Sequence, residues 1–292
     1  MKVVTIATDL ENVFLTRLLA PSCAAVGLEL TVLHPAASAS SAFTPSDKRA
    51  IMTRYLSGLR DRDELIVFTD AYDALFVRGE THIENAYAAF AKRVVFSAEP
   101  NSWPLGAIGF TLHAAPPTGR FPYLNSGGYI GPAADLLDFY VRYPAPPTDR
   151  FEVLTRLREH GYDLDKRFGW SDQYHWTLVQ HLEPEAIGLD HDAALFECYA
   201  TPNPDINIRE MLRDTEEVRD RGTESPLYQQ EHARLKASFD LPSTAAHIHF
   251  ASAVTKTVAM DMYDQGRWPA WLTDSLGSAP PTTREDLHVH EL

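Results

Sequence analysis

Short apolar runs separated by helical segments are the main pattern of this sequence. The runs cover Val3–Ala7, Leu28–Leu33, Leu65–Thr69 and Val94–Ser97. Continuous apolar runs are typical of strands that are buried on both faces of a parallel sheet. Because these runs alternate with helical segments over short connections, the pattern predicts an α/β fold with a Rossmann-like, mostly parallel sheet flanked by helices.

Helical periodicity, with apolar residues returning on one face, fills most of the segments between the strands. Thr8-Asp9 provides a cap for the first helix, and Ser171 provides one for a helix that begins near Asp172. The other predicted helices cover about residues 47–59, 81–91, 133–140 and 151–160.

The C-terminal third is less regular. Residues 201–242 are polar and predict a surface excursion with one or two helices, and Ile187–His191 with Leu195-Phe196 predicts a short strand pair. Ala246–Phe250 predicts a strand in which His247 and His249 lie on the same face. We expect a single domain over residues 1–275, with an irregular C-terminal part, and a flexible tail over residues 276–292.

The composition is that of a globular protein, with 45% hydrophobic and 23% charged residues. The net charge of -14 disfavours binding to nucleic acid, and an anionic nucleotide would need a metal ion and local donors. Cys23 and Cys198 are too few for a disulfide framework. The sequence shows neither a signal peptide nor an apolar membrane span, so we expect a cytoplasmic protein without membrane contact.

The strand Leu65–Thr69 ends in two carboxylates, Asp70 and Asp73. Open α/β sheets bind ligands at the carboxyl ends of their strands, and paired carboxylates suit a hard divalent cation that can hold a diphosphate. The sequence therefore predicts a nucleotide-sugar site here. Lys48, at the start of a helix, is placed to reach back over the strand ends, although a solvated lysine is the alternative that periodicity favours.

Two further segments carry polar or aromatic groups at breaks in regular structure. Gly127-Gly128 interrupts a strand-like segment beside Asn125 and Ser126, which indicates either a bound sugar close to the backbone or a β-bulge. Trp103 lies in a long loop rich in Pro and Gly, where it offers a stacking surface. Asp172 in a first helical turn has capping or stabilisation of the helix dipole as its alternative role.

Six segments form a pattern that is specific in its order and spacing. They are Phe68–Asp73, Val95–Glu99 with Trp103-Pro104, Leu124–Gly131, Asp172-Gln173, Leu189–His191 and Ile248-His249. Together they resemble the glycosyltransferase domain of the multifunctional procollagen lysyl hydroxylases, from about Val3 to Lys256. The resemblance implies a GT-A type fold that uses manganese and a UDP-sugar, here without the hydroxylase domain.

The resemblance also implies a role for each matching residue. Asp70, Asp73 and His249 match the manganese ligands. Asp172 and Asp190 match carboxylates that face the acceptor, and they are the candidates for a catalytic base or a stabiliser of positive charge. The residues implied to contact the nucleotide or the donor sugar, or to replace such contacts, are Thr8, Lys48, Tyr72, Trp103, Asn125, Ser126, Gly127, Gly128 and Lys256.

The implied reaction is transfer of glucose or galactose from UDP-glucose or UDP-galactose to an acceptor hydroxyl, with hydroxylysine or galactosyl-hydroxylysine as the family's acceptors. The sequence departs from the family at Phe168–Ser171, where the family has several aspartates, and at Phe250–Ala253, where it has a Gly-rich turn. A homodimer is one assembly to test. The alternatives are a non-catalytic nucleotide-sugar or glycan-binding protein, and a metal-dependent nucleotidyltransferase or phosphohydrolase.

Overall fold

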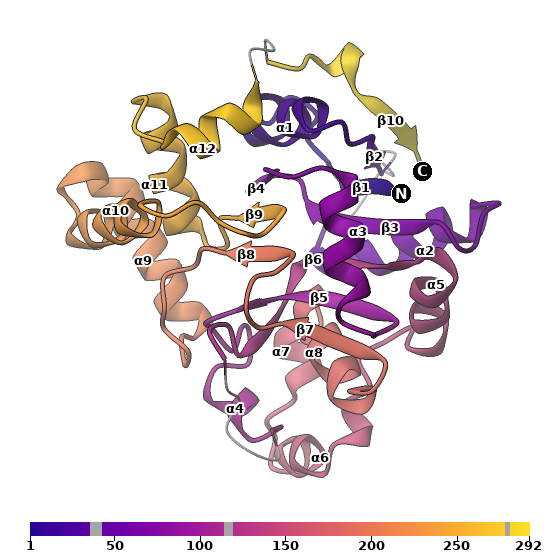
Figure 1. Cartoon of the computed structure of the whole chain (residues 1–292). Helices are drawn as coiled ribbons and strands as arrows, with labels where there is room; N and C mark the ends of the chain where they lie inside the picture. Colours follow the sequence, from indigo (N-terminus) through magenta and orange to yellow (C-terminus); the bar gives the residue numbers. More distant parts are fainter. Residues whose placement is uncertain (36–42, 114–118, 278–280) are drawn as a thin grey trace.

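The centre of the computed structural model is a sheet of seven strands in the order β10-β2-β1-β3-β6-β5-β7 (Figure 1). The structure describes residues 1–35, 43–113, 119–277 and 281–292. The strand bounds are β1 Lys2–Ile6, β2 Leu30–His34, β3 Leu65–Asp70, β5 Val94–Glu99, β6 Tyr123–Pro132, β7 Ile187–Asp190 and β10 His288–Glu291. Only β6 runs antiparallel to its neighbours in this sheet. The prediction of an α/β fold with a mostly parallel sheet is confirmed.

Helices cover both faces of this sheet because its strands bury alternate side chains on opposite sides. Phe68 and Phe96 pack on one face, under α2 (Lys48–Gly58), α5 (Ala133–Arg142) and α8 (Asp172–Leu182). Val67 and Val95 pack on the other face. The helices there are η1 (Leu15–Leu19), α1 (Ala20–Ala25) and α3 (Glu80–Ala88).

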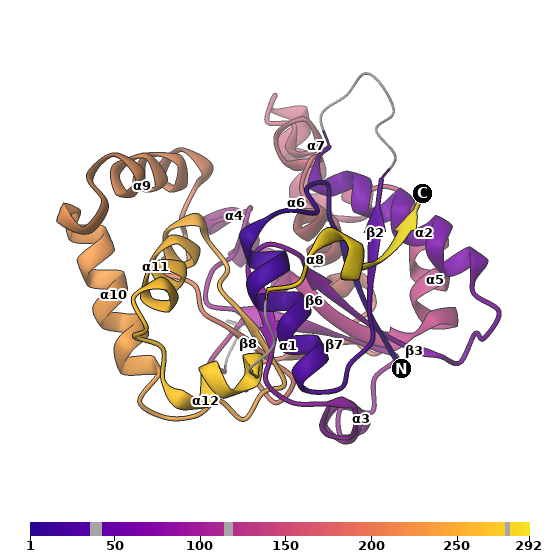
Figure 2. The same cartoon turned by 90° about the horizontal axis from the view of Figure 1, so that it is seen from above.

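A second sheet of three strands, β4 (Ala74–Phe76), β9 (His247–His249) and β8 (Phe196–Cys198), adjoins the central one. The C-terminal helices gather on this side of the molecule (Figure 2). They are α9 (Ile208–Arg221), α10 (Pro226–Ser238), α11 (Ala253–Asp264) and α12 (Ala270–Thr273). The strands predicted as a pair at Ile187–His191 and Leu195-Phe196 do not pair with each other, because β7 joins β5 and β8 joins β9.

Three short helices pack against α8 beyond β5 and β7. They are α4 (Ala107–Phe110), α6 (Glu152–Glu159) and α7 (Leu164–Phe168), and they share a core with the buried residues Tyr174 and Leu178 of α8. This group surrounds the amino end of α8, which carries Asp172.

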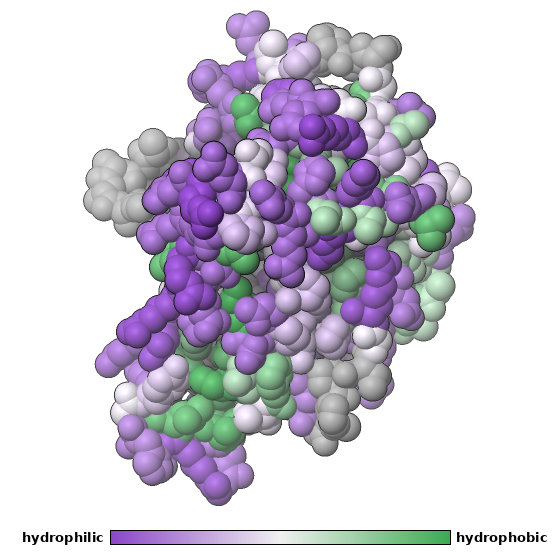
Figure 3. Space-filling view, turned by 90° about the vertical axis from the view of Figure 1, so that its left-hand side faces the viewer, coloured by the Kyte–Doolittle hydropathy of each residue, from purple (hydrophilic) through white to green (hydrophobic). Residues whose placement is uncertain are grey.

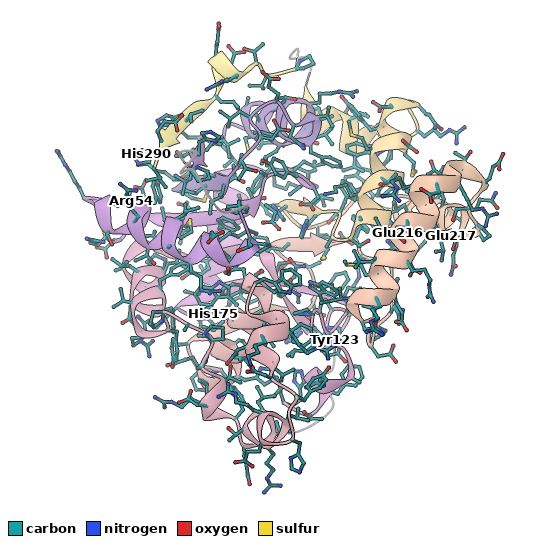
Figure 4. The ribbon with its side chains drawn as sticks, turned by 180° about the vertical axis from the view of Figure 1, so that it is seen from behind. Arg54, Tyr123, His175, Glu216, Glu217 and His290 are labelled. Carbon is teal, nitrogen blue, oxygen red and sulfur yellow. The ribbon has the colours of Figure 1, made fainter. Side chains whose placement is uncertain are left out.

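The expected flexible tail is wrong for the last residues of the chain. His288–Glu291 forms β10 and pairs in parallel with β2, and the ring of His290 lies edge-on to Tyr55 of α2 at 5.8 Å. Figure 4 shows His290 close to Arg54, on the side of the molecule away from Glu216 and Glu217 of α9. The alternating polar pattern of this segment is that of an exposed edge strand.

The surface on the side of the C-terminal helices is mostly hydrophilic, with hydrophobic residues gathered in its lower part (Figure 3). Across the described ranges, we find no helix with both the length and the apolar character needed to traverse a bilayer.

Ser252 has a backbone conformation that normally requires glycine. Its φ is 126° and its ψ is 149°, and it is the N-cap of α11, where its Oγ accepts a hydrogen bond from Thr255 N at 3.1 Å. A non-glycine residue in this region of φ/ψ space costs on the order of 1–3 kcal/mol. The N-cap bond offsets part of this strain.

We predict that Ser252→Gly raises the free energy of unfolding by about 1 kcal/mol, because it releases backbone strain while a glycine N-cap costs only a few tenths of a kcal/mol. Ser252→Ala is the matched control. It keeps the strain and removes the cap, so it should lower the free energy of unfolding by about 1 kcal/mol. Urea denaturation of the three proteins measures both shifts, and a destabilised Ser252→Gly would contradict the assignment of strain.

Candidate active site

The candidate site lies where the two sheets meet, at the carboxyl end of β3. Asp70 is the last residue of β3, and Asp73 immediately precedes β4. β4 pairs antiparallel with β9, which sets Ala74 opposite His249, and Phe250 N donates a hydrogen bond to Asp73 O at 2.8 Å. Backbone pairing therefore brings His249 to the two aspartates, although it is distant from them in the sequence.

Asp70, Asp73 and His249 form a cluster with the geometry of a metal site. One ligand atom from each lies within 4.8 Å of the others, and His249 Nε2 is 3.2 Å from Asp73 Oδ1. Within the described residues, Asp73 Oδ1 is buried without a hydrogen-bond partner. Two carboxylates and an imidazole suit a divalent cation such as manganese or another first-row metal. This orphaned oxygen and the donor set fit a bound cation.

Gly127 keeps space open beside this cluster. A Cβ atom there would lie 2.3 Å from His249 Cε1 and 2.9 Å from Asp70 Oδ2. The pairing of β5 with β6 shifts register between Phe96 and Ser97, so that Ser126 to Gly128 bulge out of this ladder. The bulge, one of the two sequence alternatives for the glycines, is present, and it brings the backbone to the candidate metal ligands; a sugar bound close to this backbone stays a prediction.

Each of the two aspartates is paired with one lysine. Lys48 Nζ from α2 forms an ion pair with Asp70 Oδ1, and Lys256 Nζ from α11 lies 3.7 Å from Asp73 Oδ2. Burial lowers the pKa of Lys48, but the charges of Asp70 and Asp172 outweigh burial and raise it overall. The ammonium of Lys48 therefore stays charged between these two carboxylates.

The protonation of Asp73 and His249 follows from their contact. Burial alone would raise the pKa of Asp73, but the neighbouring His249, Lys256 and Lys48 lower it to about 2. Burial alone would lower the pKa of His249, but the charges of Asp73, Asp70 and Glu99 raise it overall. The carboxylate of Asp73 is thus ionised at neutral pH, as a candidate metal ligand must be.

Tyr72 and Thr8 lie together at the end of β1, next to this cluster in the chain. The hydroxyl of Tyr72 accepts a hydrogen bond from Asp9 N at 2.6 Å and is 3.3 Å from Thr8 Oγ1. The amide of Asp9 therefore fixes the position of the half-buried Tyr72 ring. An aromatic ring held in this way offers a surface for a nucleoside base.

Asp172 begins α8, after the N-cap Ser171. It is 2% exposed, and neither of its carboxylate oxygens has a hydrogen-bond partner among the residues described. Burial raises the pKa of Asp172 to about 6, although Lys48 and Arg49 act in the opposite direction. The cap of α8 is Ser171, whose hydroxyl accepts from Tyr174 N, so Asp172 does not cap the helix, but its place in the first turn suits the other alternative role, stabilisation of the helix dipole.

A buried polar network joins the predicted residue Asn125 to Glu99 and Gln173, two residues to which the sequence analysis assigned no role. Glu99 Oε1 accepts hydrogen bonds from Asn125 Nδ2 at 2.9 Å and from Gln173 Nε2 at 2.7 Å. Asn125 Oδ1 in turn accepts from Gly127 N at 2.8 Å. Burial raises the pKa of Glu99 to about 7. Its place at the end of β5 was the available signal, since ligands lie at the carboxyl ends of such strands.

Gln173 ties Trp103 and Ser126 to the same network. Its Nε2 lies 3.1 Å from Trp103 O, and its Oε1 accepts from Ser126 N at 3.3 Å. Gly128 packs closely against Phe196, which a Cβ atom would approach to 2.9 Å. Trp103 is half-buried and therefore keeps part of its ring accessible.

The carboxylate of Asp190 binds backbone amides of the turn after β7. Asp190 is 1% exposed, and its carboxylate accepts hydrogen bonds from the backbone amides of Ala194, Leu195 and Phe196 at 2.7–2.8 Å. Both oxygens are used in this turn, which connects β7 to β8. The geometry thus favours a structural role for Asp190 over the predicted contact with an acceptor.

Residues 1–144 match the family model described as the PLOD GT domain. Rat procollagen-lysine,2-oxoglutarate 5-dioxygenase 1 is 29% identical over 168 residues, 56% of this chain and 20% of that protein. Human procollagen-lysine,2-oxoglutarate 5-dioxygenase 2 is 28% identical over 153 residues, 51% of this chain and 18% of that protein. The chain thus spans about a fifth of these relatives. The apo crystal structure of mouse xyloside xylosyltransferase 1 aligns with a TM-score of 0.42 and 11% identity over 85% of this chain and 96% of that one.

The raised pKa of Glu99 predicts a stability that depends on pH. Between its usual value of 4.5 and about 7, the folded state keeps a proton that the unfolded state has lost, so stability falls as pH rises through this window. Glu99→Gln removes the charge. Its stability relative to wild type should therefore increase by about 3 kcal/mol between about pH 5 and about pH 8.

Urea denaturation with a chelator present measures this difference without bound metal. Glu185→Gln is the control, because the Glu185 side chain is 99% exposed and its substitution should give the same difference at both pH values. If the difference in stability between Glu99→Gln and wild type were also the same at both pH values, Glu99 would be ionised in the folded protein over this whole pH range.

Proposed function

From the homology of this chain to the glycosyltransferase domain of the procollagen lysyl hydroxylases, we propose that it transfers a hexose from a UDP-sugar to an acceptor hydroxyl with manganese bound at Asp70, Asp73 and His249. UDP-glucose and UDP-galactose are the proposed donors. The observation that carries the proposal is the cluster of these three side chains, whose ligand atoms lie within 4.8 Å of one another beside the open face of Gly127.

The donor would lie across this end of the sheet. Tyr72 and Thr8 would hold the nucleoside, and the network of Asn125, Ser126 and Glu99 would bound the sugar. Bound manganese would neutralise the diphosphate and stabilise UDP as a leaving group. Its charge matters here, because the chain carries a net charge of -14 that repels a nucleotide.

Lys48 and Lys256 add positive charge at the same place. Each is paired with one of the two aspartates, and each is long enough to turn toward a phosphate oxygen when a cation takes the carboxylates. Electrostatic stabilisation of charge developing on the leaving oxygen is commonly the largest contribution to such catalysis.

Asp172 is the proposed acceptor-side group. Its charge acts on Lys48, which pairs with the candidate metal ligand Asp70, and both carboxylates raise the pKa of that lysine. A carboxylate with a pKa raised to about 6 by burial is suited to take a proton from an acceptor hydroxyl near neutral pH. Asp190 has no part in this proposal, since its oxygens are occupied by backbone amides.

Asp70→Asn should reduce manganese-dependent UDP release at least about 100-fold, because it replaces a charged ligand by a neutral one at nearly the same volume. The measurement is UDP release from a panel of UDP-sugars, with product identity checked by chromatography. Asp240→Asn is the control and should be fully active, because Asp240 is exposed and follows α10 in the chain. Release of nucleoside monophosphate or pyrophosphate by the wild type would instead indicate phosphoryl chemistry.

Gly127→Ala should weaken manganese binding at least about tenfold, because its Cβ would press on His249 and Asp70. Titration calorimetry with manganese alone measures the affinity. Gly58→Ala is matched to it: Gly58 ends α2 with nothing within 4 Å of its added Cβ, so its metal affinity should equal that of wild type. If Gly127→Ala bound manganese as tightly as the wild type does, the cation would not bind at this location.

A further inference from the structure

A buried hydrogen bond between two side chains links the central sheet to the three-stranded sheet. Thr69 Oγ1 of β3 lies 2.8 Å from His247 Nε2 of β9, and both residues are buried. Figure 1 shows β9 between β4 and β8, beside the central sheet. The bond therefore crosses the junction at which the candidate metal ligands lie.

Aromatic side chains hold the His247 ring within the three-stranded sheet. The ring is edge-on to Phe76 of β4, with centroids 5.1 Å apart, and to Phe196 of β8, with centroids 5.4 Å apart. A Cβ atom on Gly128 of β6 would lie 3.4 Å from His247 Cε1, so the backbone of the central sheet also limits the ring. Close packing on these sides leaves the imidazole little room to turn.

Thr69 is held from the side of the central sheet. Its carbonyl oxygen accepts a hydrogen bond from Thr5 Oγ1 of β1 at 2.7 Å, and its hydroxyl lies 3.2 Å from the carbonyl oxygen of Asp70. Backbone pairing of β3 with β1 and with β6 fixes the same strand on both edges. Thr69 and His247 are thus each fixed within their own sheet, and the bond joins the two.

This bond lies next to the candidate metal ligands in both strands. Thr69 immediately precedes Asp70, and His247 lies two residues before His249, on the same face of β9. The centroids of the two imidazole rings are 6.1 Å apart. The bond therefore sets the separation of the backbones that carry Asp70 and His249, which belong to different sheets.

The surroundings of His247 would suit an apolar side chain better. Among the residues that the structure describes, its Nδ1 is buried without a hydrogen-bond partner, and an unsatisfied buried polar atom costs free energy. Whichever of the two groups donates in the bond to Thr69, this nitrogen stays unpaired. Two phenylalanine rings and a glycine surround the imidazole, so an apolar ring would fill the space without that cost. The bond to Thr69 is what the imidazole adds.

We propose that His247 is a positioning residue of the candidate active site. Its hydrogen bond to Thr69 holds β3 and β9 at the separation at which their ligands share one divalent cation. In the described part of the chain the ligand cluster consists of Asp70, Asp73 and His249, so His247 acts through the strands and not by binding the metal. The inference rests on the proposed function, because it concerns the same cation site.

Titration calorimetry of the full chain with manganese alone tests this role. Thr69→Val keeps the shape of the side chain and removes the hydroxyl, and His247→Phe keeps a ring and removes both nitrogens. Each should weaken manganese binding at least about tenfold, as when a group that orients a metal ligand is lost. The double variant should bind about as weakly as either single variant, because both break the same bond. Thr69→Ser keeps the hydroxyl and should stay within about twofold of the wild type.

Tyr174→Phe is the control for a loss that is only structural. It removes a buried hydroxyl that lies 3.1 Å from Thr148 Oγ1, in the core that α8 shares with α6 and α7. It should lower the free energy of unfolding and leave the manganese affinity equal to that of wild type. Urea denaturation with a chelator shows which variants fold, and if His247→Phe does not fold, Thr69→Val decides.

Wild-type affinity in folded Thr69→Val or His247→Phe would overturn the inference and leave the transferase proposal in place. So would losses that add in the double variant, or a Thr69→Ser protein that binds as weakly as Thr69→Val. Manganese binding without UDP release from any donor would contradict the transferase proposal alone, and the same variants would still decide the role of His247. If the wild type bound no manganese, the cation site and the inference would both fail.

Discussion

The burial of carboxylates at the carboxyl end of the central sheet is the constraint on which the rest of the structure depends. An ionised group removed from water costs several kcal/mol unless other groups compensate it. Backbone amides compensate Asp190, and side-chain amides compensate Glu99. Asp73 relies on His249 and a lysine, and the charge of Asp172 is offset chiefly by the nearby cations Lys48 and Arg49. The less the protein itself satisfies a carboxylate, the better that carboxylate suits a ligand.

The carboxylates that the protein satisfies least lie near the junction of the two sheets. The pairing of β4 with β9 places His249 beside Asp73, and the bulge in β6 brings Gly127 close to His249 and Asp70. The candidate metal ligands therefore lie at the ends of strands on either side of the junction. The proposed acceptor side depends on α8, whose amino end holds Asp172, and on Lys48 from α2. Recognition of the acceptor can thus change without disturbing the cation site.

Much of the fold followed from apolar runs, and Asp70 with Asp73 followed from the end of a strand. His249 came only from the family resemblance, because no local pattern reports a contact between such distant segments. The reversed direction of β6 has no signature, since a buried strand has the same apolar pattern in either direction. The role of Asp190 depends on amides several residues ahead, which only the folded turn aligns. β10 was missed because an exposed edge strand carries little apolar signal.

The position of β10 has a consequence for how the protein forms during synthesis. Its partner β2 begins at Leu30, whereas β10 ends at Glu291, so this edge of the sheet stays open until residues 288–291 have been synthesised and are free to pair. Pairing of strands so far apart in sequence is slow, because a long loop must close first. Until then β2 presents unpaired backbone groups, which is the period when a nascent chain is most prone to associate with others.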